Sequence, residues 1–226
     1  MHLCLMAARS THMTYLEHND QQLWDDTLMM TVLPLAKIGL VFDRPHYVAG
    51  AKGQFPLHIQ YLFDAKTGLF SHGWTLHDDR HHFAGARWAR GNRGLTIEIP
   101  EFIELLDLDR SSPMGLCSPN GLWRTLLDVS EEDGSYGESS ATAGLAFGLL
   151  KGQRKRYIQG EYQHVALKAV RGVLENISPD GRLQNTSFGT GMGSDLEFYK
   201  EIPITPMLYG QAMAILALVE LLNIFI

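Results

Sequence analysis

Two adjacent carboxylates stand beside a tryptophan in the segment Trp24-Asp25-Asp26-Thr27. Aspartate is favoured at the start of a helix, where its oxygens accept backbone N–H groups and suit the helix dipole. Two neighbouring carboxylates can also raise the pKa of one of them, because like charge and burial both disfavour the ionised form. A carboxylic acid held in that state is able to act as a general acid and then as a general base. Helix capping and acid–base chemistry are therefore both open.

A histidine, tryptophans and arginines follow in two further segments. His72-Gly73-Trp74 places an imidazole and an indole on one predicted loop, a combination typical of a sugar site, although a lone histidine is more often a structural hydrogen-bonding group. In the second segment, Arg90 follows Trp88 and is able to bind a carboxylate through two hydrogen bonds. Gly91 would let the backbone approach a ligand closely. The pattern favours an anionic ligand with an apolar face, such as a uronic acid.

Helical spacing of apolar residues dominates the chain and predicts an all-α fold. Six helices are expected, near residues 25–41, 58–62, 97–106, 141–150, 162–174 and 207–222. Gly68, Gly121 and Gly181 lie in similar polar turns, 53 and 60 residues apart. We expect each glycine to close a helix with a positive φ. Either these are three unrelated helix ends, or the helices form a ring of α-hairpins with functional loops on one face.

Composition excludes several classes of protein. A formal net charge of -6 over 226 residues gives no basic field for nucleic acid. The two cysteines, Cys4 and Cys117, fit no metal pattern, and the mixed loop of residues 77–82 fits no ligand spacing. The sequence contains no run of about 18 apolar residues, so no membrane span is predicted. The first residues lack the basic start of a secretion signal, so we expect a cytoplasmic protein.

Five motifs in order carry a resemblance to a known group of enzymes. They are WDDTLMMTVLPLAKIG, TGLFSHGW, RWARGN, SYGESSATAG and YGQAMAILALVE. Together they resemble the unsaturated glycanuronyl hydrolases of glycoside hydrolase families 88 and 105, and family 105, the unsaturated rhamnogalacturonyl hydrolases, is the closer match. The similarity begins near residue 10 and continues over nearly the whole chain.

The resemblance implies an (α/α) toroid of six hairpins with its site at one mouth. Members hydrate the C4=C5 double bond of an unsaturated uronic acid left by a polysaccharide lyase. The acid/base aspartate of the family pattern falls on Asp26. The resemblance also implies substrate-binding residues at Trp24, His72, Trp88 and Arg90, with His12 as a further candidate, and His72 brings its neighbour Trp74 into the predicted site. No metal and no organic cofactor are implied.

Six predicted helices are half the number in such a toroid. We therefore expect residues 1–226 to form one partial toroid domain without its N-terminal hairpins and one internal helix, and residues 1–10 to be poorly ordered. An open ring leaves helix faces uncovered, which predicts exposed apolar patches and self-association. The alternative to an unsaturated-uronide hydrolase is a catalytically inactive truncated homologue that binds sugar or a partner. A further alternative is a toroid glycosidase with a second carboxylate across the site from Asp26, for which Asp25 is expected to point elsewhere.

Overall fold

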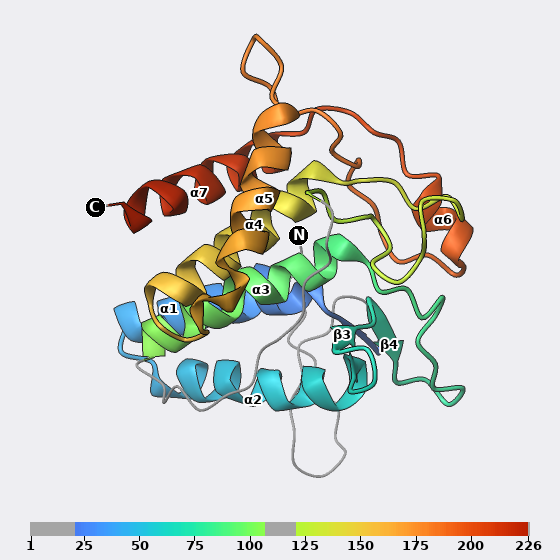
Figure 1. The fold of residues 1–226 in the computed structure, drawn as a ribbon. Helices are drawn as coiled ribbons and strands as arrows, with labels where there is room; N and C mark the ends of the chain where they lie inside the picture. Colours follow the sequence, from blue (N-terminus) through green and yellow to red (C-terminus); the bar gives the residue numbers. More distant parts are fainter. Residues whose placement is uncertain (1–20, 107–120, 226) are drawn as a thin grey trace.

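The computed structural model describes residues 21–106 and 121–225, and these form a mostly helical fold (Figure 1). The helical elements are η1 (Leu28–Val32), α1 (Leu33–Val41), α2 (Pro45–Leu62), α3 (Ala89–Leu106), α4 (Ser139–Arg154), η2 (Gly160–Tyr162), α5 (Gln163–Glu175), α6 (Leu196–Lys200) and α7 (Leu208–Ile224). The strands are β1 (Gln22–Trp24), β2 (Phe63–Asp64), β3 (Leu69–Phe70) and β4 (Gly73–Thr75). Residues 1–10, expected to be poorly ordered, lie outside the described ranges.

The six predicted helices are present, but two of them begin earlier than the apolar pattern indicated. α2 begins at Pro45 and α3 at Ala89, and each contains an internal proline, Pro56 or Pro100. Glycine and proline lower local helix propensity, whereas packing of the helices against their neighbours stabilises them. The early start of α3 places residues 89–92, the last four of the RWARGN motif, in the first turn of this helix.

The mostly helical fold agrees with the all-α expectation, and the described residues also form two small antiparallel sheets that the apolar pattern did not predict. β1 pairs with β4, and β2 pairs with β3. Strands of two or three residues are too short to show a period-two pattern of apolar residues. Backbone hydrogen bonds between distant segments therefore define these strands, and local sequence does not reveal them.

The three turn glycines do not share one structure. Gly68 and Gly181 have positive φ values of 70° and 83°, as expected. Gly68, however, lies in the hairpin between β2 and β3 and does not end a helix. Gly121 is absent from the positive-φ glycines and packs against the Lys168 carbonyl of α5. The prediction that all three close a helix was wrong, because a Pro/Gly turn motif does not specify the element on either side.

α4 is the central helix of the fold and packs against α3, α5 and α7. Its residues 139–152 are all buried. Gly144 and Gly148 lie one turn apart, and a Cβ on either would overlap with α3, at the Arg93 side chain and at the Thr96 carbonyl respectively. These two glycines therefore let α3 and α4 approach closely. α3 in turn packs on η1 and α1, which lie over α2 (Figure 1).

α7 carries apolar residues on all faces, and one face is exposed. The inner residues Met213, Ala214 and Ala217 join the core formed with α4 and α5. The exposed apolar side chains of this helix and its end are Leu208, Ile215, Leu216, Val219, Leu222 and Phe225. This uncovered stripe agrees with the expected apolar patches. Within residues 21–106 and 121–225, no helix combines the length and apolar character that crossing a bilayer requires.

Candidate active site

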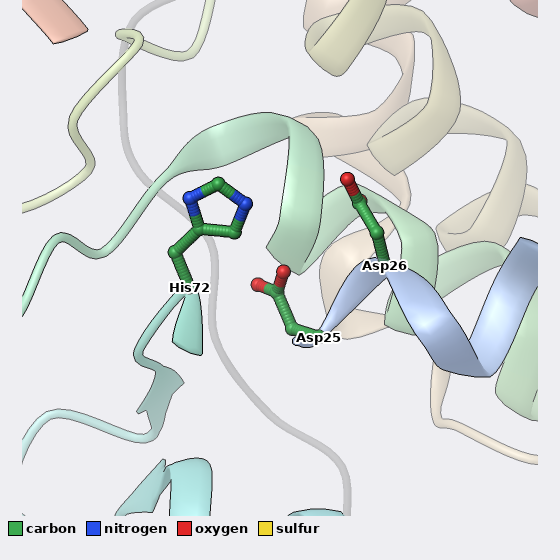
Figure 2. A group of neighbouring side chains, drawn as sticks. All are labelled: Asp25, Asp26 and His72. Atoms are coloured by element: carbon green, nitrogen blue, oxygen red, sulfur yellow. The ribbon is translucent and has the colours of Figure 1, made fainter. Parts of the chain in front are cut away.

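The pairing of β1 with β4 brings the Trp24-Asp25 segment next to the His72-Gly73 segment. In this antiparallel pair Trp24 lies opposite Gly73. The next backbone contact is a 2.9 Å hydrogen bond from the Asp25 N–H to the His72 carbonyl. Side chains at such opposite positions are close neighbours. Figure 2 shows the His72 ring and the Asp25 carboxyl group directed toward one another, with Asp26 on the following residue.

The Asp25 carboxyl group is fully buried. Its exposed fraction is 0%, and neither oxygen has a hydrogen-bond partner within the part of the chain that the structure describes. Burial, followed by the negative charge of Asp26, raises the pKa of Asp25 well above its usual value. A Cβ on Gly91 of α3 would lie closer than 3.0 Å to both carboxylate oxygens. The space for this acid group therefore depends on a glycine.

Neither aspartate side chain caps the helix that follows. Thr27 is the N-cap residue of η1, and no side chain supplies the cap hydrogen bond. Asp26 is half-buried, and its negative charge acts on the Arg93 guanidinium of α3, where it opposes the lowering of the Arg93 pKa by desolvation. One oxygen of each aspartate and one ring nitrogen of His72 lie within 4.8 Å of one another. Asp25 and Asp26 therefore lie close together and do not face one another across a site.

His72 is held in place by a hydrogen bond and by aromatic rings. Its Nδ1 lies 2.7 Å from the Tyr199 hydroxyl, which comes from α6. The ring centroids of Trp24 and Trp88 lie 5.5 and 4.3 Å from that of His72. Only 1% of His72 is exposed. This enclosure defines the direction of the imidazole before any ligand arrives.

The tautomer of His72 follows from the contacts of Tyr199. The Gly193 N–H donates to the Tyr199 oxygen at 3.1 Å. The hydroxyl proton can go to the His72 Nδ1 at 2.7 Å or to the Met192 sulfur at 3.4 Å. Because a thioether is a weak acceptor, the imidazole nitrogen takes this hydrogen bond. The ring proton of neutral His72 then resides on Nε2.

The Arg90 side chain makes several contacts within the protein. Its Nη1 donates to the Ser187 and Phe188 carbonyls, both at 3.2 Å, and to the Tyr209 hydroxyl. Its guanidinium also lies 4.3 Å from the Trp88 ring centroid. These contacts anchor the 187–188 loop to the start of α3. Ser187 is held from the other side by Glu138, the N-cap residue of α4, whose carboxylate accepts from the Ser187 N–H.

The remaining predicted residues divide into two groups. Trp24 and Trp88, which are 6% and 1% exposed, lie with His72 in one aromatic cluster. Trp74 is half-buried and contacts Tyr61 and His82. His12 lies outside the described residues.

Two neighbouring side chains did not stand out in the sequence. Arg93 lies three residues after Arg90, and this spacing on a helix places both on one side. That spacing is a signal from which Arg93 could have been found. Tyr199 is 127 residues from its partner His72. Because no local pattern connects residues so far apart, only the folded chain identifies Tyr199.

Asp25, Asp26 and His72 are, within the described ranges, the group of acidic and histidine side chains close enough together to enclose a cation. Such spacing is common without an ion. The expectation that the site needs neither a metal nor an organic cofactor stays a prediction.

Comparison with known sequences identifies relatives over almost the whole chain. A sequence model of the family described as Glycosyl Hydrolase Family 88 matches residues 6–225. The protein named unsaturated rhamnogalacturonyl hydrolase YesR, from Bacillus subtilis, is 30% identical over 220 residues, which cover 90% of this chain and 60% of that protein. The chain thus spans about 60% of the length of this relative.

Solved structures agree with this assignment. A possible member of family GH105 from Salmonella enterica serovar Paratyphi A is 53% identical, with a TM-score of 0.86, over 93% of this chain and 59% of that one. Its counterpart from Klebsiella pneumoniae is 54% identical, with a TM-score of 0.84, over 93% and 58%. The unsaturated glucuronyl hydrolase of Bacillus sp. GL1, at 18% identity and a TM-score of 0.66, covers 90% of this chain and 59% of that one, and it shares the fold.

Proposed function

The chain belongs to Glycosyl Hydrolase Family 88, and from this premise we propose that it releases unsaturated galacturonic acid from lyase-generated rhamnogalacturonan oligosaccharides. The observation that carries the proposal is the placement of Asp26 beside a buried carboxyl group and an oriented histidine. The name of the Bacillus subtilis relative supports the choice of substrate. The two solved structures at 53% and 54% identity support a family 105 type of site.

The reaction that suits this site is hydration of the C4=C5 double bond. Asp26 donates a proton to C4, and positive charge develops at C5 and the ring oxygen. A water molecule attacks C5 while the carboxylate accepts one of its protons. The resulting hemiketal opens, and the glycosidic bond then breaks. The whole sequence consumes one water molecule and returns Asp26 to its starting state.

Six residues are proposed to bind the substrate around Asp26. They are His12, Trp24, His72, Trp74, Trp88 and Arg90. Indole rings suit the apolar face of a sugar, and the imidazole and guanidinium groups suit its hydroxyl and carboxylate groups. The burial of Trp88 and His72 indicates that these two act mainly by holding Trp24 and Arg90 in position.

Hydrolysis by two opposed carboxylates is less well supported. That mechanism needs carboxyl groups that flank the scissile bond, about 5–9.5 Å apart. Asp25 and Asp26 are consecutive residues with oxygens within 4.8 Å. They do not flank a bond from opposite sides, and Asp25 is fully buried, which favours the hydration mechanism.

The ultraviolet absorbance of the substrate provides the test of activity. The conjugated enol ether of a rhamnogalacturonan disaccharide absorbs ultraviolet light, and hydration removes this absorbance. We expect purified, folded chain to remove it with a kcat of roughly 1 s⁻¹ or more, the lower end for enzymes. Full retention of absorbance, with folding confirmed by circular dichroism, would favour the inactive sugar-binding homologue.

We also propose that copies of the chain associate through the exposed stripe of α7. Leu208, Ile215, Val219 and Leu222 present apolar side chains to solvent, and burying such a patch is favourable. Light scattering after size-exclusion chromatography should show a mass that rises with protein concentration. Val219→Lys should weaken this association at least about tenfold. A monomer at all concentrations would contradict the proposal.

A further inference from the structure

The Asp25 carboxyl group is a buried acid that the proposed reaction does not yet use. It is 0% exposed and has no hydrogen-bond partner among the described residues. The ionisable groups that face it are Asp26 on the same segment, Arg93 on α3, His72 before β4 and Tyr199 on α6. We propose that Asp25 and Asp26 share one proton and act as a single acid–base pair. This inference rests on the proposed function.

Electrostatics favours one proton in the pair over none. Two carboxylates within 4.8 Å of one another repel strongly where burial keeps water away. Burial and the charge of Asp26 both raise the pKa of Asp25, whereas the nearby backbone N–H groups of Asp26 and Asp25 and the charge of Arg93 oppose this shift. Such a pair loses its protons in two steps that belong to both residues, as in other carboxylate pairs.

The contacts of His72 indicate where the Asp25 proton points. With the Tyr199 hydroxyl donating to Nδ1, neutral His72 carries its proton on Nε2. The imidazole is then a donor on that side and cannot accept a proton from Asp25. The Asp26 carboxylate remains as the acceptor. His72 and Tyr199 are thus positioning residues for the pair, and Gly91 provides the space in which Asp25 lies.

A shared proton suits both halves of the hydration. The pair donates its proton to C4 as the C4=C5 π bond breaks and a C4–H bond forms. Water then forms the C5–O bond, and the proton that it loses returns to the pair. Asp26 exchanges the proton with substrate and water, and the proton that it shares with Asp25 stabilises each charge state of Asp26. The pair ends the cycle with one proton, as it began.

The first test measures stability against pH without substrate. An acid whose pKa is higher in the folded than in the unfolded chain contributes stability below the unfolded pKa, and this stability is lost as pH rises through the folded value. Each retained proton lowers the folding equilibrium constant about tenfold per pH unit in that window. We expect urea denaturation between about pH 5 and pH 8 to show this fall in the folding equilibrium constant. In Asp25→Asn the constant should fall less steeply, by about one factor of ten less per pH unit.

Glu98 provides a matched control. It is also 0% exposed with two unpartnered oxygens among the described residues, and burial raises its pKa well above the usual value. Unlike Asp25, it has no neighbouring carboxylate among the causes of its shift. Glu98→Gln should flatten the stability curve as Asp25→Asn does. It should leave the pH profile of activity unchanged, since Glu98 lies about two helical turns beyond Gly91.

The second test is the pH profile of kcat. In Asp25→Asn the shared proton is lost, so the limb of the profile that reports the acid form should move by at least about one pH unit. KM should change by less than about threefold, because Asp25 does not touch the substrate. If Asp25→Asn showed the same pH dependence of stability as the wild-type chain and an unchanged pH profile of kcat, the shared proton would be refuted. The stability measurement needs no substrate, so it tests the shared proton whether or not the chain is active. Its failure is therefore distinguishable from a failure of the proposed function.

Should Asp25→Asn fail to fold, the wild-type chain still provides a test. Carbon NMR of protein labelled at the aspartate carboxyl carbon should show two coupled titrations, one of them well above the usual value of about 4. Titration of every aspartate near about pH 4 would refute the pair. A stability curve that changes after dialysis against a chelator would show that a cation, and not a proton, neutralises the two carboxylates, and would also refute it.

Discussion

Asp26→Asn should lower kcat on the unsaturated disaccharide by at least about 100-fold, the usual contribution of a positioned acid–base group. Asparagine keeps the size of the side chain but cannot donate a proton to C4 or accept one from water. Asp26 is only half-buried and its carboxylate does not cap η1, so the chain should still fold, with a lower unfolding midpoint because the buried Arg93 loses a compensating charge. The loss of ultraviolet absorbance measures kcat, and circular dichroism measures folding.

Asp43→Asn is the control for this change. Asp43 is exposed and lies beyond the far end of α1, with a φ of 50° that asparagine tolerates well. The same chemical substitution there should leave kcat unchanged. If Asp26→Asn retained more than about a tenth of the wild-type kcat, Asp26 would not be the acid of the reaction.

Gly91→Ala should destabilise the chain and reduce activity together. Alanine in an open helix position is more stable than glycine by about 0.5–1 kcal/mol. At Gly91, however, the new Cβ would overlap with both Asp25 oxygens, and the buried carboxyl group has no free space beside it. Overpacking of this kind costs about 1–3 kcal/mol. Displacement of Asp25 also moves Asp26, so kcat should fall at least about tenfold.

Two comparisons separate this clash from a general effect of alanine. Gly50→Ala in α2 places a Cβ where no atom lies within 4 Å, and should leave the chain equally stable or stabilise it. Gly91→Ala should cost less in an Asp25→Ala background, because the overlapping carboxyl group is then absent. Additive effects of the two substitutions on urea unfolding would contradict the packing of Asp25 against Gly91.

The Arg90 side chain is held in place by contacts with residues far away in the sequence. The side chain is 6% exposed, and its Nη1 donors reach the Ser187 and Phe188 carbonyls. A buried guanidinium that satisfies backbone carbonyls stabilises the loop beside it. Arg90 thus stabilises the 187–188 loop beside the site, and its contact with a substrate carboxylate stays a prediction.

Local patterns in the sequence were sufficient for the helices and for the family. Apolar spacing depends on residues three or four apart, and such spacing predicted α1, α4, α5 and α7 nearly to their ends. The five motifs identified the family, and the comparisons confirmed it. The adjacent Asp25 and Asp26 were also visible as a pair able to shift a pKa, because their proximity follows from the chain itself.

The direction of each side chain was decided by contacts between distant segments. β1 and β4 are far apart in the chain, with 46 residues between Asp25 and His72, and no period-two pattern marks either strand. That pairing places the Asp25 carboxyl group beside His72, a contact that the sequence did not predict. Packing of the helices brings the Tyr199 hydroxyl to His72. The same packing places Gly91 beside the Asp25 carboxyl group, where only a glycine leaves enough space. The sequence by itself thus determined which acids the protein carries, whereas burial and neighbouring charge, which exist only in the folded chain, decided how Asp25 holds its proton.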